Sequence, residues 1–221
     1  MPFSDDEFVP LTPVNFFQLS ADCRYLPHGK GESFPLLTKT LAAKFLLPDT
    51  SALCAEESFA DVSMGWNEDG LEFFVRVKEP FRRAFFPAVD QGDSVELFID
   101  TREVKSAGFN TRFCHHFYFL AEGIDGNFAG EITRFRTEDT HPLCDSNELK
   151  IKSLIQTSGY ALNIFIPNHC LYGYDPAQFN RLGFSYRINR AEGFPQHLSV
   201  VTEDFPVDQQ PSLWASLKLI K

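Results

Sequence analysis

The stretch GDSVELFIDTR, residues Gly92–Arg102, alternates apolar and polar side chains along its length. Val95, Leu97 and Ile99 share one face, because successive side chains of a β-strand point to opposite sides. The other face carries Glu96, Phe98 and Asp100. The pattern predicts a strand that buries one face in a core and presents two carboxylates on the other.

A second strand is predicted shortly after it, over RFCHHFYFL, residues Arg112–Leu120. If the two strands pair, their polar and aromatic side chains gather on one concave face. Aromatic rings, carboxylates and guanidinium groups together suit the recognition of a glycan or a peptide. The candidate ligand-binding residues are Glu96, Phe98, Asp100, Arg102, Arg112, His116 and Tyr118.

Phenylalanine is unusually abundant in this chain of 221 residues, with 24 Phe against two Trp and two Met. Phe favours strands and buries a large area, so the excess indicates a sheet-rich core. The net charge of −10 argues against binding to nucleic acid or to anionic membranes, because both attract clustered Lys and Arg. The sequence holds no such cluster.

The location of the protein is predicted from its first residues and its cysteines. Residues Met1–Glu7 are acidic and lack the basic and apolar regions of a Sec signal peptide, and no segment has the length of a membrane span. The five cysteines are widely separated, with no paired metal-type spacing. These observations predict reduced thiols and a cytoplasmic location, with signal-independent export left open.

Short alternating segments recur along the chain and predict an all-β protein. Besides the two strands above, the predicted strands are Ala60–Trp66, Leu71–Val77, Leu149–Thr157, Tyr160–Ile166, Leu182–Ile188, His197–Val201 and Leu213–Ile220. The first two form a predicted hairpin, and so do the next two. Many short strands, few helical patterns and no repeat predict an antiparallel β-sandwich.

The first part of the chain differs from the rest in composition. Residues 1–34 are rich in Pro and Gly and are predicted to be an extended lead-in, with one strand around Val14–Leu19. Thr38–Leu47 fits either a short helix or an edge strand. No linker rich in Ser or Gly divides the remainder, so residues 35–221 are predicted to form a single β-sandwich domain.

Ordered motifs in this sandwich resemble the family 9 carbohydrate-binding module fold, which is related to DOMON-type domains. They are Ala60–Leu71, Asp93–Asp100, and Leu182–Phe184 with Leu217–Leu219. The chain looks still more like a bacterial group of stand-alone proteins of this fold with no settled function, through Asp100–Arg102, Arg112–His115 and Pro211–Trp214. The resemblance covers roughly residues 35–221.

The resemblance implies a non-catalytic module for carbohydrate and, as in some members, a structural calcium ion. Sugar-binding members hold a terminal sugar between two exposed tryptophans, and this chain departs from that pattern. Val89–Gly92 has no Trp where the first would stand, and Val200–Gln210 has only Phe205 in the region of the second. Trp66 and Trp214 are predicted to be core residues instead.

Catalysis by paired carboxylates is poorly supported by the spacing of the acidic residues. Glu96 and Asp100 are four residues apart on one strand, which separates them by roughly 13 Å, too far for a glycosidase pair. Salt bridges to Arg102 and Arg112 across neighbouring strands are the favoured interpretation of both carboxylates.

The run Cys114-His115-His116 contains residue types that bind metals. In a strand, Cys114 and His116 share a face and His115 points the other way, so at most two ligands converge. His141 and Cys144 could supply a missing pair, but a hydrogen-bonded core His115 is the favoured interpretation. We therefore predict no metal and no other cofactor, apart from the calcium that the resemblance implies.

The sequence thus predicts a non-catalytic binding module whose ligand is a glycan. A protein–protein interaction module that has lost sugar binding is the alternative. An enzyme using Cys114, His116 and Asp100 ranks third, because Cys114 lacks an adjacent base and nothing marks an oxyanion hole.

Overall fold

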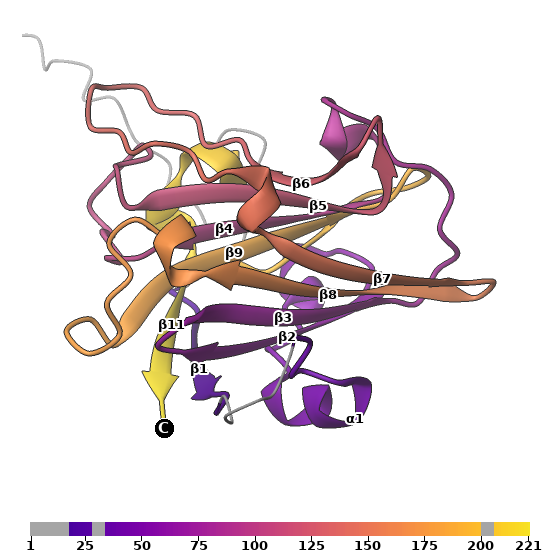
Figure 1. Cartoon of the computed structure of the whole chain (residues 1–221), viewed down its shortest axis with the longest axis horizontal. Coiled ribbons are helices and arrows are strands. Elements are labelled where there is room, and N and C mark those ends of the chain that lie inside the picture. The colour runs from indigo at the N-terminus through magenta and orange to yellow at the C-terminus, as the bar shows by residue number, and fades with distance from the viewer. Residues whose placement is uncertain (1–17, 28–33, 200–205) are drawn as a thin grey trace, which may run out of the picture.

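The computed structural model describes residues 18–27, 34–199 and 206–221, whose strands form a curled, two-layered sheet (Figure 1). The strands are β1 (Ser20–Tyr25), β2 (Ala60–Asn67), β3 (Gly70–Val77), β4 (Ser94–Asp100), β5 (Cys114–Ile124), β6 (Asn127–Glu131), β7 (Lys150–Gln156), β8 (Gly159–Pro167), β9 (Arg181–Asn189), β10 (Gln196–His197) and β11 (Ala215–Ile220). The short α-helices are α1 (Lys39–Ala42) and α2 (Ser51–Cys54). The 3-10 turns are η2 (Ala43–Phe45), η3 (Val89–Gln91), η4 (Ser146–Glu148), η5 (Asn168–Cys170), η6 (Val207–Gln209) and η7 (Pro211–Leu213).

The strand order is β6-β5-β4-β9-β11-β1-β2-β3-β8-β7, and β10 pairs with β9. The sheet folds over so that β6, β5, β4 and β9 form one layer, and β2, β3, β8 and β7 form the other (Figure 1). The all-β sandwich predicted from the sequence is confirmed. One strand departs from the antiparallel pattern, since β1 runs parallel to both β11 and β2.

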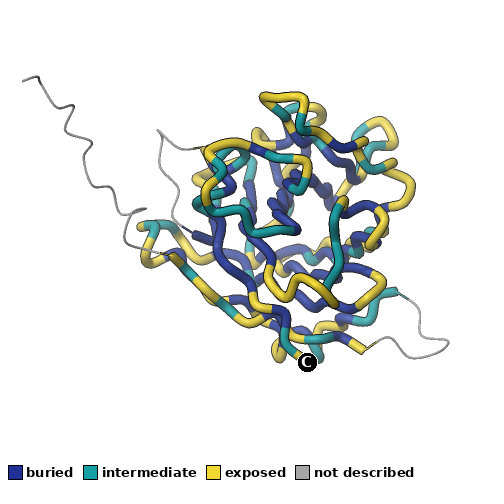
Figure 2. Tube along the Cα trace, turned by 90° about the vertical axis from the view of Figure 1, so that its left-hand side faces the viewer, coloured by how far each residue is buried: buried dark blue, intermediate teal, exposed yellow. Residues whose placement is uncertain are grey.

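The core lies between the two layers and is built by the alternation seen in the sequence. Val95, Leu97 and Ile99 of β4 are completely buried. In the core the ring of Phe73 stacks on that of Phe184 at 5.8 Å, which joins β3 to β9. Figure 2 shows buried residues along the strands and exposed residues mainly in the loops at their ends.

Both predicted hairpins are present, and their registers explain their turns. Trp66 pairs with Leu71 as predicted, and both side chains are buried in the core. The turn is tighter than the predicted four residues, because Asn67 and Gly70 already pair. Gly70 has φ +149, and a Cβ at this position would collide with the carbonyl oxygen of Ile166 on β8, so only glycine fits here.

The N-terminal part of the chain contributes more to the sheet than predicted. β1 lies inside the range expected to be a lead-in, yet it occupies a position between β11 and β2. Of the strand predicted at Val14–Leu19, residues 14–17 lie outside the described residues. The segment Thr38–Leu47 is mainly helical, as α1 and η2, with a single bridge from Leu46 to Ser63.

The cysteines correct one prediction from the sequence. Cys144 and Cys170 form a disulfide that ties the loop before β7 to η5 after β8, so the expectation of five reduced thiols is wrong for these two. Cys23, Cys54 and Cys114 are not in disulfides. Within the described parts of the chain, no helix has the length and apolar character needed to cross a membrane.

Candidate functional site

The candidate site lies on the outer face of β4, β5 and β9, opposite the core. Because β4 pairs with β5 on one side and β9 on the other, Phe98 stands between His116 and Ser185. Glu96 stands between Tyr118 and Arg187 in the same way. The alternation of three adjacent strands therefore places their polar side chains on one surface.

The Glu96 carboxylate is the centre of this group. Arg187 donates to it twice, from Nε to Oε2 at 2.6 Å and from Nη2 to Oε1 at 2.9 Å. His116 Nε2 lies 2.8 Å from Oε1 and donates there, because the carboxylate can only accept. Asn189 Nδ2 donates to Oε2 at 2.6 Å. Glu96 is thus held in one orientation by three side chains from two neighbouring strands.

The charge of Glu96 is stabilised although the side chain is only 1% exposed. Burial by itself raises the pKa of this carboxyl, but hydrogen bonds from His116 and Arg187 and their charges outweigh it and bring the pKa down to about 2. Burial lowers the pKa of Arg187, and the bond to Glu96 more than compensates, so the Arg187 pKa is raised. The pair is therefore ionised at neutral pH.

An aromatic cluster closes one side of the site. The Phe98 ring contacts His116, with ring centroids 4.4 Å apart, and Trp214 at 5.9 Å. Trp214 donates from Nε1 to the carbonyl of Val207 at 2.7 Å. Trp214 is buried, as predicted. Trp214 and Val207 pack with Phe98 and Cys114, so the segment around η6 and η7 covers the end of the face near Cys114.

One part of the site remains open to solvent around Arg187. The side chain of Arg187 is 21% exposed, and the charges of Asp208 and Asp90 contribute, after that of Glu96, to its raised pKa. Phe86 is 39% exposed and lies against the buried Tyr118, with ring centroids 5.6 Å apart. Arg187 and Tyr118 flank Glu96 on this face, so the partly exposed guanidinium group lies on one side of that carboxylate and the exposed ring of Phe86 on the other. Phe205 lies outside the described residues.

The structure separates the predicted binding residues into two groups. Glu96, Phe98, His116 and Tyr118 do lie together, but they are buried and do not line an open concave surface. The three others do not join this group.

Asp100 is buried at the end of β4, where it accepts hydrogen bonds from the backbone N–H groups of Arg102 and Val104. Arg102 donates to the carbonyl of Gly173, and its guanidinium group lies over the ring of Phe179. Arg112 forms an exposed ion pair with Asp139. The sequence predicted salt bridges from Glu96 and Asp100 to Arg102 and Arg112, and these partners are wrong. Glu96 pairs with Arg187, and Asp100 caps a turn.

Cys114 and His116 do not form a nucleophilic pair. Cys114 is buried beside Phe98 and Trp214, and burial raises the pKa of its thiol to about 12. His116 Nε2 is already engaged by Glu96. A thiol with this pKa is almost entirely protonated at neutral pH, which makes it a poor nucleophile.

Arg187 and Asn189 are the site residues that the sequence did not reveal. The segment Leu182–Ile188 was predicted to be a strand, and its alternation places Ser185 and Arg187 opposite the core residues. The sequence did not show which strand pairs with this segment. Once β9 is paired with β4, Arg187 falls directly opposite Glu96.

A second polar cluster lies on the inner side of the same layer. His115, Glu131 and His141 bring one potential ligand atom each to within 4.8 Å of the others. This is not the set considered from the sequence, because Cys144 is in a disulfide and His116 faces Glu96. The calcium ion implied by the resemblance stays a prediction.

Comparisons with known proteins bear on the fold. The sequence matches no protein-family model and no curated protein. Two similar solved structures are of a family 9 carbohydrate-binding module from Caldicellulosiruptor kristjanssonii. The first, in complex with cellotriose, is 21% identical and has a TM-score of 0.56, covering 72% of this chain and 74% of the module. The second, in complex with glucose, is 20% identical with a TM-score of 0.57, covering 73% and 76%.

A third solved structure, of a proposed carbohydrate-binding protein from Bacteroides uniformis, is 12% identical with a TM-score of 0.58 and covers 92% of this chain and all of that one. The chain has a family 9 carbohydrate-binding module fold. Identities at this level establish the fold of the family 9 module and leave the ligand of this chain to be argued from its own residues.

Proposed function

We propose that this chain is a non-catalytic carbohydrate-binding protein whose glycan site is the partly exposed surface around Arg187 on the outer face of β4, β5 and β9. The observation that carries the proposal is the bidentate ion pair, with two hydrogen bonds, between Arg187 and the buried Glu96. A guanidinium group fixed in this way keeps its remaining N–H donors in one plane at the surface, where they can meet sugar hydroxyls.

Other groups on this face can supply the hydrogen-bond acceptors and the apolar contact that a sugar needs. The carboxylates of Asp90 and Asp208 accept hydrogen bonds from hydroxyl groups, and the exposed ring of Phe86 offers an apolar surface to the C–H face of a sugar. This site has one exposed ring among the described residues where sugar-binding relatives have two tryptophans, so we expect weak binding.

A catalytic role is not proposed. Both oxygens of Glu96 are already occupied by hydrogen bonds, and those of Asp100 accept from the backbone. A glycosidase needs one carboxyl group that can release or take up a proton near neutral pH, and Glu96 with a pKa of about 2 does not supply it.

Calorimetric titration with glucose, cello-oligosaccharides and then a glycan array tests the proposal. Wild-type protein is compared with Phe86→Ala and Asp90→Ala, both exposed residues of the proposed site, and with the control Arg24→Met, an exposed residue on β1. We expect at least one glycan to bind the wild type and the control, and to bind Phe86→Ala and Asp90→Ala more weakly. No binding by the wild type, when a tryptophan-clamp module binds in parallel, would refute the proposal.

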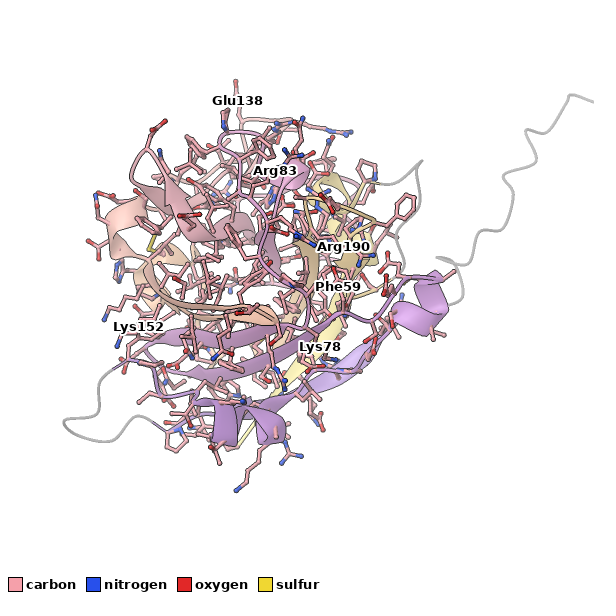
Figure 3. All side chains as sticks on the ribbon, turned by 90° about the vertical axis from the view of Figure 1, so that its right-hand side faces the viewer. Phe59, Lys78, Arg83, Glu138, Lys152 and Arg190 are labelled. Carbon is pink, nitrogen blue, oxygen red and sulfur yellow. A yellow bond between two sulfur atoms is a disulfide. The ribbon has the colours of Figure 1, made fainter. Side chains whose placement is uncertain are left out.

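A protein–protein interaction module is the second candidate, and a groove on the other layer favours it. The groove has a volume of ≈ 610 Å³ and lies on the outer faces of β3, β8 and β7 beside α1. Its lining includes Lys39, Arg76, Lys78 and Lys152 and no acidic residue. Figure 3 labels Lys78 and Lys152 on this layer. A basic groove in a protein of net charge −10 suits an acidic partner.

One of the strands that form this groove is an edge strand. β7 is the last strand of the described sheet, and Leu154 on it is 59% exposed. An extended acidic peptide can pair with such an edge and place its carboxylates among the lysines.

Fluorescence anisotropy with a labelled poly-glutamate peptide tests this candidate. The double variant Arg76→Glu with Lys152→Glu is compared with Lys218→Glu, an exposed lysine on β11. Salt-sensitive binding that only the double variant loses favours the interaction module. Equal binding by all three proteins rules out this groove as the docking site.

The cellular location stays a prediction. A disulfide such as Cys144–Cys170 is typical of oxidising compartments and counts against the cytoplasm. Alkylation of thiols in intact source cells, followed by mass spectrometry, shows whether this pair is bonded where the protein works.

A further inference from the structure

Three buried side chains from separate elements meet on the inner side of the layer formed by β6, β5, β4 and β9, next to β6. His115 comes from β5, Glu131 ends β6, and His141 belongs to the loop that precedes η4. The side chains of His115 and Glu131 are fully buried, and that of His141 is almost so. Nothing in the proposed glycan site uses this cluster, because it lies on the opposite face of β5.

The three side chains point at one position. His115 Nδ1 and His141 Nε2 each lie 2.8 Å from Glu131 Oε1, and the three atoms all lie within 4.8 Å of one another. Two imidazole nitrogens and one carboxylate oxygen are ligand types that zinc and related divalent transition metals prefer.

The atoms that face away from this position also have partners. His141 Nδ1 donates to the carbonyl of Arg112 at 2.7 Å, and His115 Nε2 faces the carbonyl of Tyr172 at 3.5 Å. Glu131 Oε2 accepts from the backbone N–H of Cys144 at 2.8 Å. Metal-bound histidines usually donate their second N–H to a carbonyl or a carboxylate, which fixes the ring and its tautomer.

A purely hydrogen-bonded cluster makes heavy demands on these groups. Each ring nitrogen of His141 faces an oxygen atom, Nδ1 the carbonyl of Arg112 and Nε2 the carboxylate of Glu131. Glu131 Oε1 would accept from His115, His141 and the Thr133 hydroxyl at once. The two imidazole rings lie with centroids 4.2 Å apart. Three side chains therefore converge on one carboxylate oxygen.

We propose that His115, Glu131 and His141 form a binding site for a divalent transition metal ion of the zinc class. His115 would bind it through Nδ1, His141 through Nε2, and Glu131 through Oε1, with water in the remaining position. Ligand atoms of a tetrahedral zinc ion are separated by roughly 3.3 Å. The two 2.8 Å contacts therefore widen by about half an ångström, a shift within reach of small rotations of the rings.

The site has a structural role in this proposal. The loop from Ile132 to Asp145 has no regular secondary structure, and His141 connects it to β5 and β6. Metal binding would hold this loop and, through Cys144, the disulfide to η5. The proposal is independent of the glycan site and survives if no sugar binds.

Zinc titration of tag-free, chelator-treated full-length protein tests the proposal. Isothermal calorimetry and metal analysis after dialysis should show one zinc ion per chain with a dissociation constant in the micromolar range or below. His141→Gln and Glu131→Gln should weaken zinc binding by about 100-fold or more. The matched control is His169→Gln, because His169 is exposed and faces Glu148 alone. Equal zinc binding by His141→Gln and His169→Gln would overturn the proposal.

A second measurement uses only the wild-type protein, in case the variants fail to fold. Zinc should shift the ring-nitrogen resonances of His115 and His141 while those of His116 and His197 stay in place, since these two face Glu96 and Glu56. Cobalt in place of zinc should give the visible absorption of a tetrahedral site. No zinc binding to the wild type, or shifts confined to other histidines, shows instead a hydrogen-bonded cluster without metal.

Discussion

Arg187 of β9 and Glu96 of β4 form a two-point ion pair on the outer face of the sandwich, with contacts of 2.6 and 2.9 Å. Glu96 is almost completely buried, whereas the side chain of Arg187 is 21% exposed and extends from this carboxylate to the surface. The pair therefore has two roles, since it neutralises a buried charge and fixes a partly exposed guanidinium group at the surface. Each role predicts a different measurement.

Loss of Arg187 should destabilise the fold strongly. Arg187→Met leaves the carboxylate of Glu96 buried without its guanidinium partner, and breaking a buried ion pair from one side typically costs about 3 kcal/mol or more. Urea denaturation of the wild type and the variant measures the difference. The double variant Glu96→Gln with Arg187→Met should recover part of the loss, because no unpaired charge remains. A single-variant cost below about 1 kcal/mol would show that the pair behaves like an exposed salt bridge.

Acid should weaken the protein through Glu96. The pKa of this carboxyl is about 2 in the folded state and near 4.5 in the unfolded chain, so its stabilising contribution is complete above about pH 4.5. That contribution is lost as the pH falls from about 4.5 towards 2, and it amounts to roughly 3 kcal/mol. Glu96→Gln removes it. The gap in unfolding free energy between wild type and Glu96→Gln should therefore shrink across this interval; a gap that is constant from pH 6 to pH 3 would contradict the assignment.

Much of the fold was predictable from sequence because it rests on local alternation. β4, both hairpins and β9 follow from patterns of apolar residues whose faces the structure confirms. The place of β1 was not predictable, because its six residues show no clear alternation and its parallel pairing with β11 joins opposite ends of the chain. The sheet order depends on such long-range pairings, which leave no local signal.

The candidate site was predictable in part, for the same reason. Glu96 and His116 were brought together by the alternation of two neighbouring strands. Arg187 lies 91 residues after Glu96, and only the pairing of β4 with β9 makes them partners. Likewise His115 was expected to be a hydrogen-bonded core residue, and its contact with His141 depends on the path of an irregular loop.

The disulfide should contribute substantially to stability. It closes a loop of 26 residues between Cys144 and Cys170, and the entropy lost by the unfolded chain corresponds to about 3.5 kcal/mol. Cys144→Ala with Cys170→Ala should therefore lower the unfolding free energy of the protein by several kcal/mol in non-reducing buffer. Dithiothreitol should destabilise the wild type to a similar degree and leave the double variant unchanged. Cys54→Ala, which removes a cysteine that is not in a disulfide, serves as the control.

Asp100 should prove to be a structural residue, although it stands on the same strand face as Glu96. Its carboxylate accepts from the backbone N–H groups of Arg102 at 2.9 Å and Val104 at 2.6 Å, so it fixes the turn that leaves β4. Asp100→Ala leaves both donors without this acceptor and should cost about 2 kcal/mol of unfolding free energy. Glycan and zinc binding should stay at wild-type levels in the folded variant, since Asp100 touches neither proposed site. Asp22→Ala on β1, an exposed position, controls for the loss of one negative charge. A large loss of glycan affinity without loss of stability would return Asp100 to the binding site.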